Sequence, residues 1–176
     1  MNLNNYKEIL ALKDFRRLWI AQMLSGLGNS LYFVSLMWLI WENTNSTLHT
    51  GLFAILYDIP QLFLGLWIGV VISRFSLKKV MVFSDIIRAL GVCIVIACYL
   101  MDIFSVYILY LAIMLEGLML VIHRPASNAI LPQIVPKEKL ESANATSQLS
   151  NRIINVAGYG VAGVIITTVG ALFSII

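Results

Sequence analysis

Charged side chains are scarce in this sequence, and their scarcity excludes most soluble folds. Of the 176 residues, only 12% are charged and 60% are hydrophobic, and the mean hydropathy is +0.87. A soluble domain carries about 25% charged residues, so this chain has more apolar surface than water accommodates. The net charge of +3 is too small to indicate a nucleic-acid partner. The composition indicates a protein that is surrounded by the lipid bilayer.

Sequence motifs of enzymes and metal sites are also lacking. No glycine-rich loop ends in Lys-Ser or Lys-Thr, so ATP is not the expected energy source. His49 and His123 fall on opposite predicted sides of the membrane, which argues against a shared metal site. Cys93 and Cys98 would point about 140° apart on a helix, so we expect two small buried side chains and no disulfide. These absences predict neither an enzyme nor a cofactor.

Long apolar runs dominate what is present. A helix needs about 20 apolar residues to cross a bilayer, and the expected spans are residues 18–41, 51–72, 80–100, 103–122 and 146–169. A truncated sixth span begins at about residue 171. Pro125, Pro132 and Pro136 interrupt the polar stretch after the fourth span, where we expect a connection. The predicted fold class is an all-α membrane bundle of five transmembrane helices plus the start of a sixth.

Lys and Arg residues fall on one side of this predicted topology. All 12 lie in or near the N-terminus, the second-to-third connection and the fourth-to-fifth connection. The other two connections, residues 42–50 and 101–102, contain none. By the positive-inside rule, the N-terminus is cytoplasmic, and we expect a multi-pass protein of the plasma membrane. Lys7, Lys78 and Lys137 are then cytoplasmic, whereas Asn45 and Asp102 face outward.

The connection between the second and third spans has a recognisable pattern. It reads GVVISRFSLKKVMVFSDIIRA and resembles the signature loop of the major facilitator superfamily. In that loop a glycine ends the second helix and a basic cluster opens the third. The matching residues here are Gly69, Arg74, Lys78 and Lys79. Ser73 stands where the family has an acid.

Two further segments narrow the resemblance to the macrolide-efflux-type branch of that superfamily. FRRLWIAQMLSGLGNSLYFVSLMWLIW, from Phe15, resembles its first helix, and RPASNAILPQIVPKEKLESANA, from Arg124, resembles its fourth-to-fifth connection. Ile113 and Tyr159 stand where proton-coupled relatives usually have arginine and proline. Such transporters have two six-helix halves with the substrate between them. The resemblance implies an N-terminal half that exports hydrophobic small molecules or drugs in exchange for protons. Its partner would be a missing C-terminal half or a second copy.

Two carboxylates and a polar stripe are the candidates for substrate binding or proton coupling. Asp58 and Glu116 lie within predicted spans, where an acid is costly and therefore a functional candidate. Gln22, Ser25 and Asn29 have helical spacing, so they form one stripe on the first span. The stripe faces either a cavity or a hydrogen-bonding neighbour helix. Each acid could instead form a structural hydrogen bond or extend toward the membrane interface.

Charged residues near the cytoplasmic side form a second group of candidates. Asp85 and Arg88 are three residues apart and therefore neighbours on the third span. The resemblance implies a cytoplasmic gate made of these two residues and of Gly69, Arg74, Lys78, Lys79 and Arg124. The alternative for Asp85 and Arg88 is an ordinary ion pair at a helix end.

Small residues predict where helices approach each other closely. The small-xxx-small spacing lets backbones come together in lipid. It occurs at Gly65 and Gly69 in the second span and at Gly158 and Ala162 in the fifth. Gly163 belongs to the same glycine-rich segment, and we expect it to pack in the same way.

Two hypotheses for the whole chain stay open at this point. The first is half of a proton-driven exporter. The second is a truncated or non-transporting integral membrane protein that associates with another membrane protein. The reading frame downstream of Ile176 distinguishes them, because a transporter half would be followed by about six further spans.

Overall fold

The computed structural model describes residues 8–72, 74–103 and 105–170. Within these ranges the chain is helical and contains no strand, which confirms the all-α fold class. The elements are α2 (Lys13–Thr44), α3 (Thr47–Ile72), α4 (Leu77–Leu100), α5 (Val106–Ile134), the 3-10 helix η1 (Lys137–Lys139) and α6 (Leu140–Val169). The expected start of a sixth span, from residue 171, lies outside the described residues.

All five long helices have the length and apolar composition needed to cross a membrane. Helical backbone satisfies its own hydrogen bonds, which is what the bilayer interior requires. Large apolar side chains lie on the outside of the bundle; Leu66 and Trp67 of α3, for example, are 88% and 73% exposed. Cys93 is also exposed, contrary to expectation, and neither cysteine forms a disulfide within the described residues. The chain is therefore a multi-pass membrane protein.

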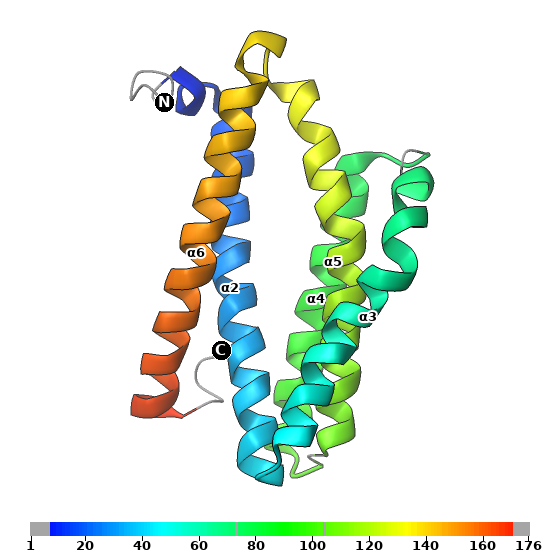
Figure 1. Cartoon of the computed structure of the whole chain (residues 1–176), viewed down its shortest axis with the longest axis vertical. Helices are drawn as coiled ribbons and strands as arrows, with labels where there is room; N and C mark the ends of the chain where they lie inside the picture. Colours follow the sequence, from blue (N-terminus) through cyan, green and yellow to red (C-terminus); the bar gives the residue numbers. More distant parts are fainter. Residues whose placement is uncertain (1–7, 73, 104, 171–176) are drawn as a thin grey trace.

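The helices form two groups (Figure 1). Helix α2 packs along α6, whereas α3 and α4 both pack on α5. At one end the groups are joined by the short α2–α3 connection. Asn45 ends α2 there with a φ of 47°, a left-handed conformation that Asn tolerates better than most residues. At the other end η1 joins α5 to α6.

Helix α5 departs from the connection that the prolines predict after residue 122. It continues through Pro125 and Pro132 and ends at Ile134. Each proline removes one backbone hydrogen bond, but neighbouring helices make such a loss tolerable in membrane bundles. Burial of Leu131, which is 5% exposed, favours the extra helical turns. The break comes only at Pro136, and α6 begins at Leu140, upstream of the expected span 146–169.

Two apolar clusters hold the bundle together. The larger one joins all five long helices, and its fully buried members are Leu36, Ile40, Phe53, Leu109 and Ile113. The smaller one lies beside η1 and contains Ile9, Phe15, Leu131, Val135 and Ala143. Along α2, α5 and α6 the polar side chains of the candidate site lie between these two clusters.

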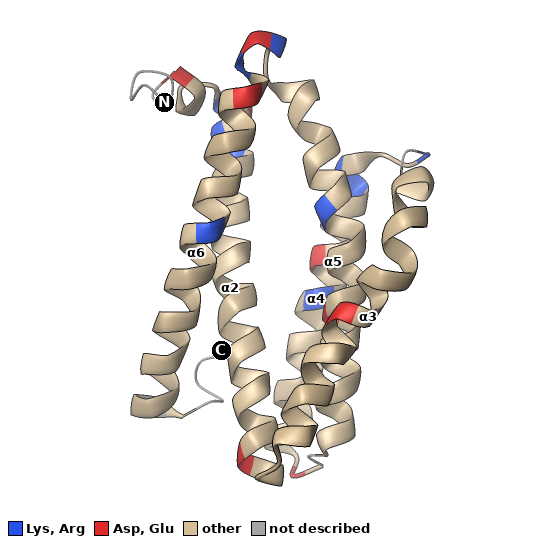
Figure 2. Cartoon of the chain, viewed as in Figure 1, with Lys and Arg blue, Asp and Glu red and all other residues tan. Residues whose placement is uncertain are grey.

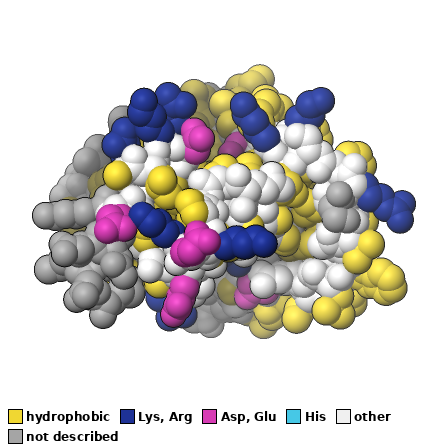
Figure 3. All heavy atoms as spheres, turned by 90° about the horizontal axis from the view of Figure 1, so that it is seen from above, with side chains coloured by type: hydrophobic (Ala, Val, Ile, Leu, Met, Phe, Trp, Pro, Cys, Tyr) yellow, Lys and Arg dark blue, Asp and Glu magenta, His cyan; other side chains and the backbone are white. Residues whose placement is uncertain are grey.

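Charged residues differ between the two ends of the bundle. The end with the α2–α3 and α4–α5 connections shows acidic segments but no Lys or Arg among the described residues (Figure 2). Figure 3 views the opposite end, where Lys and Arg side chains extend from its middle to its edge. Lys139 binds Glu8 there at 2.8 Å, and this hydrogen bond and charge lower the pKa of Glu8. The polarity supports a cytoplasmic N-terminus, which stays a prediction. Lys7 lies outside the described residues.

Candidate functional site

Two cavities lie between the helices. The larger, which we call the groove, has a volume of about 860 Å³ and is lined by α2, α5 and α6 together with Tyr57 of α3. The smaller, which we call the side cavity, has a volume of about 410 Å³ and lies between α2, α4 and Glu116 of α5. Both are lined by Ser25 and Asn29 of α2. The groove has the size of a small-molecule site, for which about 300–1,000 Å³ is usual.

The polar stripe on α2 faces these cavities. Ser25 and Asn29 line both of them, and Gln22 lines the groove. The Gln22 amide also donates a hydrogen bond to the Ser127 hydroxyl of α5. The cavity and the hydrogen-bonded neighbour, which the sequence presents as alternatives, therefore occur together.

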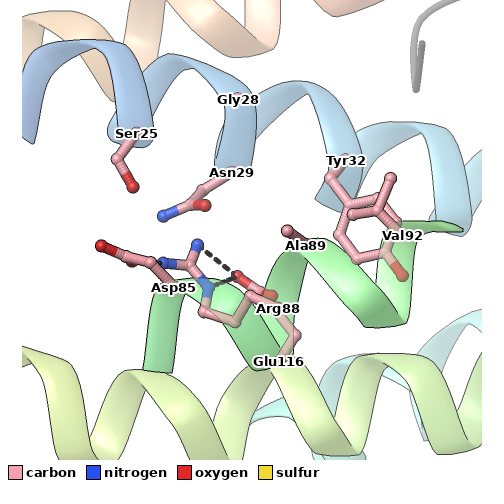
Figure 4. A pocket seen from close by; sticks show the side chains of 9 residues that line it. All are labelled: Ser25, Gly28, Asn29, Tyr32, Asp85, Arg88, Ala89, Val92 and Glu116. Atoms are coloured by element: carbon pink, nitrogen blue, oxygen red, sulfur yellow. Dashed lines mark hydrogen bonds and ion pairs between the residues drawn. The ribbon is translucent and has the colours of Figure 1, made fainter. Parts of the chain in front are cut away.

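An ion pair between α4 and α5 forms one wall of the side cavity (Figure 4). Arg88 donates from Nε and Nη2 to Oε1 of Glu116 at 2.9 and 2.7 Å. Both side chains are buried, at 7% and 6% exposure. Arg88 also donates from Nη1 to Oδ1 of Asp85 at 3.2 Å, and Nε2 of His123 lies 3.5 Å from the same oxygen. We call Asp85, Arg88, Glu116 and His123 the charge cluster.

The charge cluster carries one excess negative charge when His123 is neutral. Two carboxylates then face a single guanidinium. Charge at membrane depth is costly unless it is paired, and Arg88 can compensate only one of the two acids. The Asp85 side chain is 48% exposed, so part of it is open to the side cavity.

Helices approach each other closely at two glycines. A Cβ atom on Gly117 would collide with the backbone carbonyl of Tyr57, so α3 lies directly against α5 next to Glu116. A Cβ atom on Gly158 would lie 2.5 Å from the Ser30 Cβ atom of α2. Ala162, one turn further along α6, is fully buried. Small residues thus set the α3–α5 and α2–α6 contacts on either side of the groove.

Several other candidate residues lie apart from the cavities. Asp58 is exposed on α3, lines neither cavity, and has no ion pair or hydrogen bond from its side chain within the described ranges. A Cβ atom on Gly69 or Gly163 would meet no other described residue within 4 Å, and one on Gly65 would meet only Gln61 of its own helix. The close packing expected at these three glycines is not found in the part of the chain that the structure describes.

The expected cytoplasmic gate is only partly assembled in the described residues. Asp85 and Arg88 are neighbours, but Arg88 binds Glu116 inside the bundle. Arg88 lies about 16 Å along α4 from its start, because helical residues rise about 1.5 Å each. The basic residues of the signature loop are exposed and form no ion pair among the described residues; they are Arg74, Lys78 and Lys79. Ser73 lies outside the described residues.

Comparison with known proteins decides the family. The sequence profile described as "transmembrane secretion effector" matches residues 9–176, almost the whole chain. The chain belongs to this family. Relatives named as MFS-type transporters confirm that it is a branch of the major facilitator superfamily, as the signature loop predicts.

Curated relatives of this transmembrane secretion effector segment are named as transport proteins. The chain is 28% identical to macrolide efflux protein A of Streptococcus pyogenes over 163 residues, which cover 92% of the chain and 39% of the relative. It is 23% identical to the uncharacterized MFS-type transporter YvqJ of Bacillus subtilis, over 93% of the chain and 39% of the relative. The multidrug efflux pump Tap of Mycolicibacterium fortuitum is 25% identical, over 86% and 38%. The chain thus spans about two fifths of each of these relatives. No solved structure matches it significantly.

Two arginines of the groove lie where the sequence pattern does not predict them. Arg124 lies within α5 rather than in a connection and donates from Nη1 to Oε1 of Gln61 at 3.3 Å. Arg152 of α6 lines the groove but is not among the predicted site residues. A signal for it exists, because it lies within a run of amides at helical spacing on α6. These amides are Asn144, Gln148, Asn151 and Asn155.

Tertiary packing brings two further residues into the site. His123 pairs with Asp85 across the α4–α5 contact. Tyr32 of α2 lines the side cavity, is 5% exposed, and has a buried hydroxyl without a hydrogen-bond partner among the described residues. His123 belongs to no local pattern that predicts its pairing with Asp85. Tyr32 follows Asn29 by three residues, so it continues the polar stripe of α2 at helical spacing and could have been identified from the sequence.

Proposed function

We propose that this chain is the N-terminal half of a secondary transporter that exports hydrophobic or amphipathic small molecules. The observation that carries the proposal is the groove, a cavity of about 860 Å³ lined largely by polar side chains between helices suited to lipid. Relatives named as a macrolide efflux protein and a multidrug efflux pump support it. In this superfamily the substrate binds between two halves near the membrane midplane. The groove would form one wall of that site.

In this proposal a proton gradient drives export and the charge cluster is the coupling site. One proton neutralises the excess negative charge of the cluster. Glu116 binds Arg88 of α4, and Tyr32 of α2 and Asp85 of α4 line the side cavity with it. Arg88 is the one cationic side chain that forms an ion pair with Glu116 within the described residues. The protonation state of the acid therefore decides how strongly Arg88 is held.

Proton binding by Glu116 would change which of the two acids binds Arg88 more strongly. With Glu116 ionised, the guanidinium makes two hydrogen bonds to Glu116 and one to Asp85. With Glu116 protonated, its attraction for Arg88 falls and Asp85 becomes the stronger partner. Arg88 then moves toward the side cavity, across which Ser25 and Asn29 point (Figure 4). Because these two α2 residues also line the groove, α2 would link the proton site to the substrate site.

Glu116→Gln tests the coupling site in the product of the complete reading frame. Glutamine keeps the shape and part of the hydrogen bonding but cannot titrate. We expect gradient-driven export to be lost while substrate binding stays measurable. Asp58→Asn is the matched control. It also removes an acid from a spanning helix, but the Asp58 side chain lines neither cavity. Export by Glu116→Gln at the wild-type rate across about pH 6–8 would show that Glu116 is structural.

A non-transporting protein that associates with another membrane protein is the second candidate. The exposed apolar face of α3 favours it, because Leu62, Phe63, Leu66 and Trp67 are 73–88% exposed and offer a surface for a partner helix. A reading frame without further spans downstream of Ile176 would support this candidate over the transporter.

A further inference from the structure

The groove contains positive charge and no acid. Its charged lining residues are Arg124 of α5 and Arg152 of α6, and His123 is its other basic group. Neither arginine forms an ion pair within the described residues. Arg124 is hydrogen-bonded to the neutral amide of Gln61, and Arg152 has no hydrogen-bond partner in the same part of the chain. A cationic ligand would therefore meet no compensating charge on this wall.

The acids of the adjoining side cavity are already engaged. Asp85 and Glu116 line the side cavity rather than the groove, and both bind Arg88. They are therefore not available to neutralise the two groove arginines. The groove wall is electropositive while the neighbouring charge cluster is electronegative.

The two groove arginines lie at similar distances from the η1 end of the bundle. Arg152 is about 18 Å along α6 from Leu140, and Arg124 is about 15 Å along α5 from Ile134, at about 1.5 Å per residue. Both distances are measured from the η1 end, so the two side chains lie at similar levels. A guanidinium that lines a groove without an ion pair among the described residues is available to bind an anionic ligand.

The groove becomes aromatic further from η1. Phe33 lies edge-on to Tyr57 with ring centroids 5.0 Å apart, and 6.5 Å from the ring of Tyr159. All three residues line the groove. Tyr159 follows Arg152 by seven residues, or about 10 Å along α6. The groove thus offers two cationic groups at one level and an aromatic surface about 10 Å away.

We propose that the groove binds anionic amphiphiles: an acidic group contacts Arg124 and Arg152, and the apolar part lies against Phe33, Tyr57 and Tyr159. This inference rests on the proposed function only in taking the groove as a ligand site. Guanidinium groups bind carboxylate, sulfonate and phosphate groups through paired N–H donors. Two of them at one level favour an anion and repel a cation. The charge of the groove thus selects a substrate class.

Three compounds that share a pyrene body on a short alkyl chain and carry anionic, neutral or cationic head groups test the inference. Pyrenebutyrate, pyrenebutanol and pyrenebutyl-trimethylammonium are titrated into the product of the complete reading frame, purified in an uncharged detergent. We expect the anion to bind at least about tenfold more tightly than the cation. Arg124→Gln or Arg152→Gln reduces that preference, and the double variant removes it. Lysine at both positions restores most of it. Arg16→Gln removes an exposed arginine at the start of α2 that lines neither cavity, and it leaves the preference unchanged.

The uncharged pyrenebutanol reports whether each variant keeps an intact groove. Equal binding of the three compounds, tighter binding of the cation, or an unchanged preference in a double variant that still binds pyrenebutanol would overturn the inference. Competition separates two sources of the anion: displacement by phosphatidylglycerol but not phosphatidylcholine identifies a lipid, and no displacement identifies a soluble compound. The experiment measures binding rather than export. The anion preference can therefore be absent in a protein that transports, and it can be present in a protein that does not.

Discussion

At Gly117 the absence of a side chain decides how closely two helices meet. The carbonyl of Tyr57 in α3 occupies the space that a Cβ atom would need. Glu116 is the neighbouring residue on α5 and is only 5% exposed. The close approach of α3 therefore helps to keep water away from the acid that we propose for proton coupling. A backbone atom cannot move aside as a flexible side chain can, so this contact tolerates little change.

We expect Gly117→Ala to destabilise the bundle by about 1–3 kcal/mol, because overpacking of this size exceeds the gain in helix propensity. Gly160→Ala is the matched control in a position with open space around it. It should be neutral or slightly stabilising, since alanine favours helix by up to about 1 kcal/mol. Thermal unfolding of both variants in the same detergent is the measurement. A higher melting temperature for Gly117→Ala would show that α3 does not lie against this glycine.

At the scale of elements, the η1 turn holds three segments of the chain together. It joins α5 to α6, lies beside the smaller apolar cluster, and binds the segment before α2 through Lys139 and Glu8. The pKa of Glu8 is lowered by the hydrogen bond and charge of Lys139. A carboxyl group whose pKa is lowered on folding stabilises the folded state when the pH is above the pKa of the unfolded state, which is about 4.5 for Glu8. The stabilisation is lost as the pH falls through the lowered value.

The contact between Glu8 and Lys139 should therefore open at low pH. We expect amide hydrogen exchange of residues 8–12 to accelerate modestly between about pH 7 and pH 3, after correction for the intrinsic exchange rate. The effect should be small because both side chains are partly exposed to solvent. Glu8→Gln should exchange faster at pH 7 and lose the pH dependence. An identical pH response in the wild type and in Glu8→Gln would show that the pair does not hold this segment.

The sequence predicts the helices better than it predicts their ends and contacts. Apolar runs identify all five long helices, because lipid imposes a simple requirement on length and hydropathy. The predicted end of α5 is wrong because the prolines are local sequence signals, whereas the burial of Leu131 depends on tertiary packing. The pairing of Arg88 with Glu116, 28 residues apart, likewise depends on how α4 packs on α5. Glu116 is recognisable as costly, but its partner is not.

At the scale of the whole molecule, charge and polarity follow two directions. Along the membrane normal, Lys and Arg favour the η1 end (Figure 2). Across the bundle, apolar side chains face outward while polar ones line the two cavities. The first direction sets the expected orientation in the membrane. The second is what a transport site between two helical bundles requires.

The orientation can be tested by thiol labelling in intact cells. In a background with Cys93→Ser and Cys98→Ser, single cysteines replace Asn45 or Lys78. The positive-inside rule places position 45 outside and position 78 in the cytoplasm, so a membrane-impermeant reagent should label only the first. Both should react after the membrane is permeabilised. Labelling of position 78 in intact cells, with none at position 45, would show that the topology is the opposite of the expected one.

Export by residues 1–176 alone, compared with export by the product of the complete reading frame, tests most directly whether the groove is one wall of a two-walled site. Alternating access requires two bundles that move about a shared site. We therefore expect the 176-residue chain to insert into the membrane without lowering drug accumulation, and the complete product to lower it. Crosslinking identifies any homodimer, which could supply the second wall. Energy-dependent export by a verified monomer of residues 1–176 would contradict the half-transporter account.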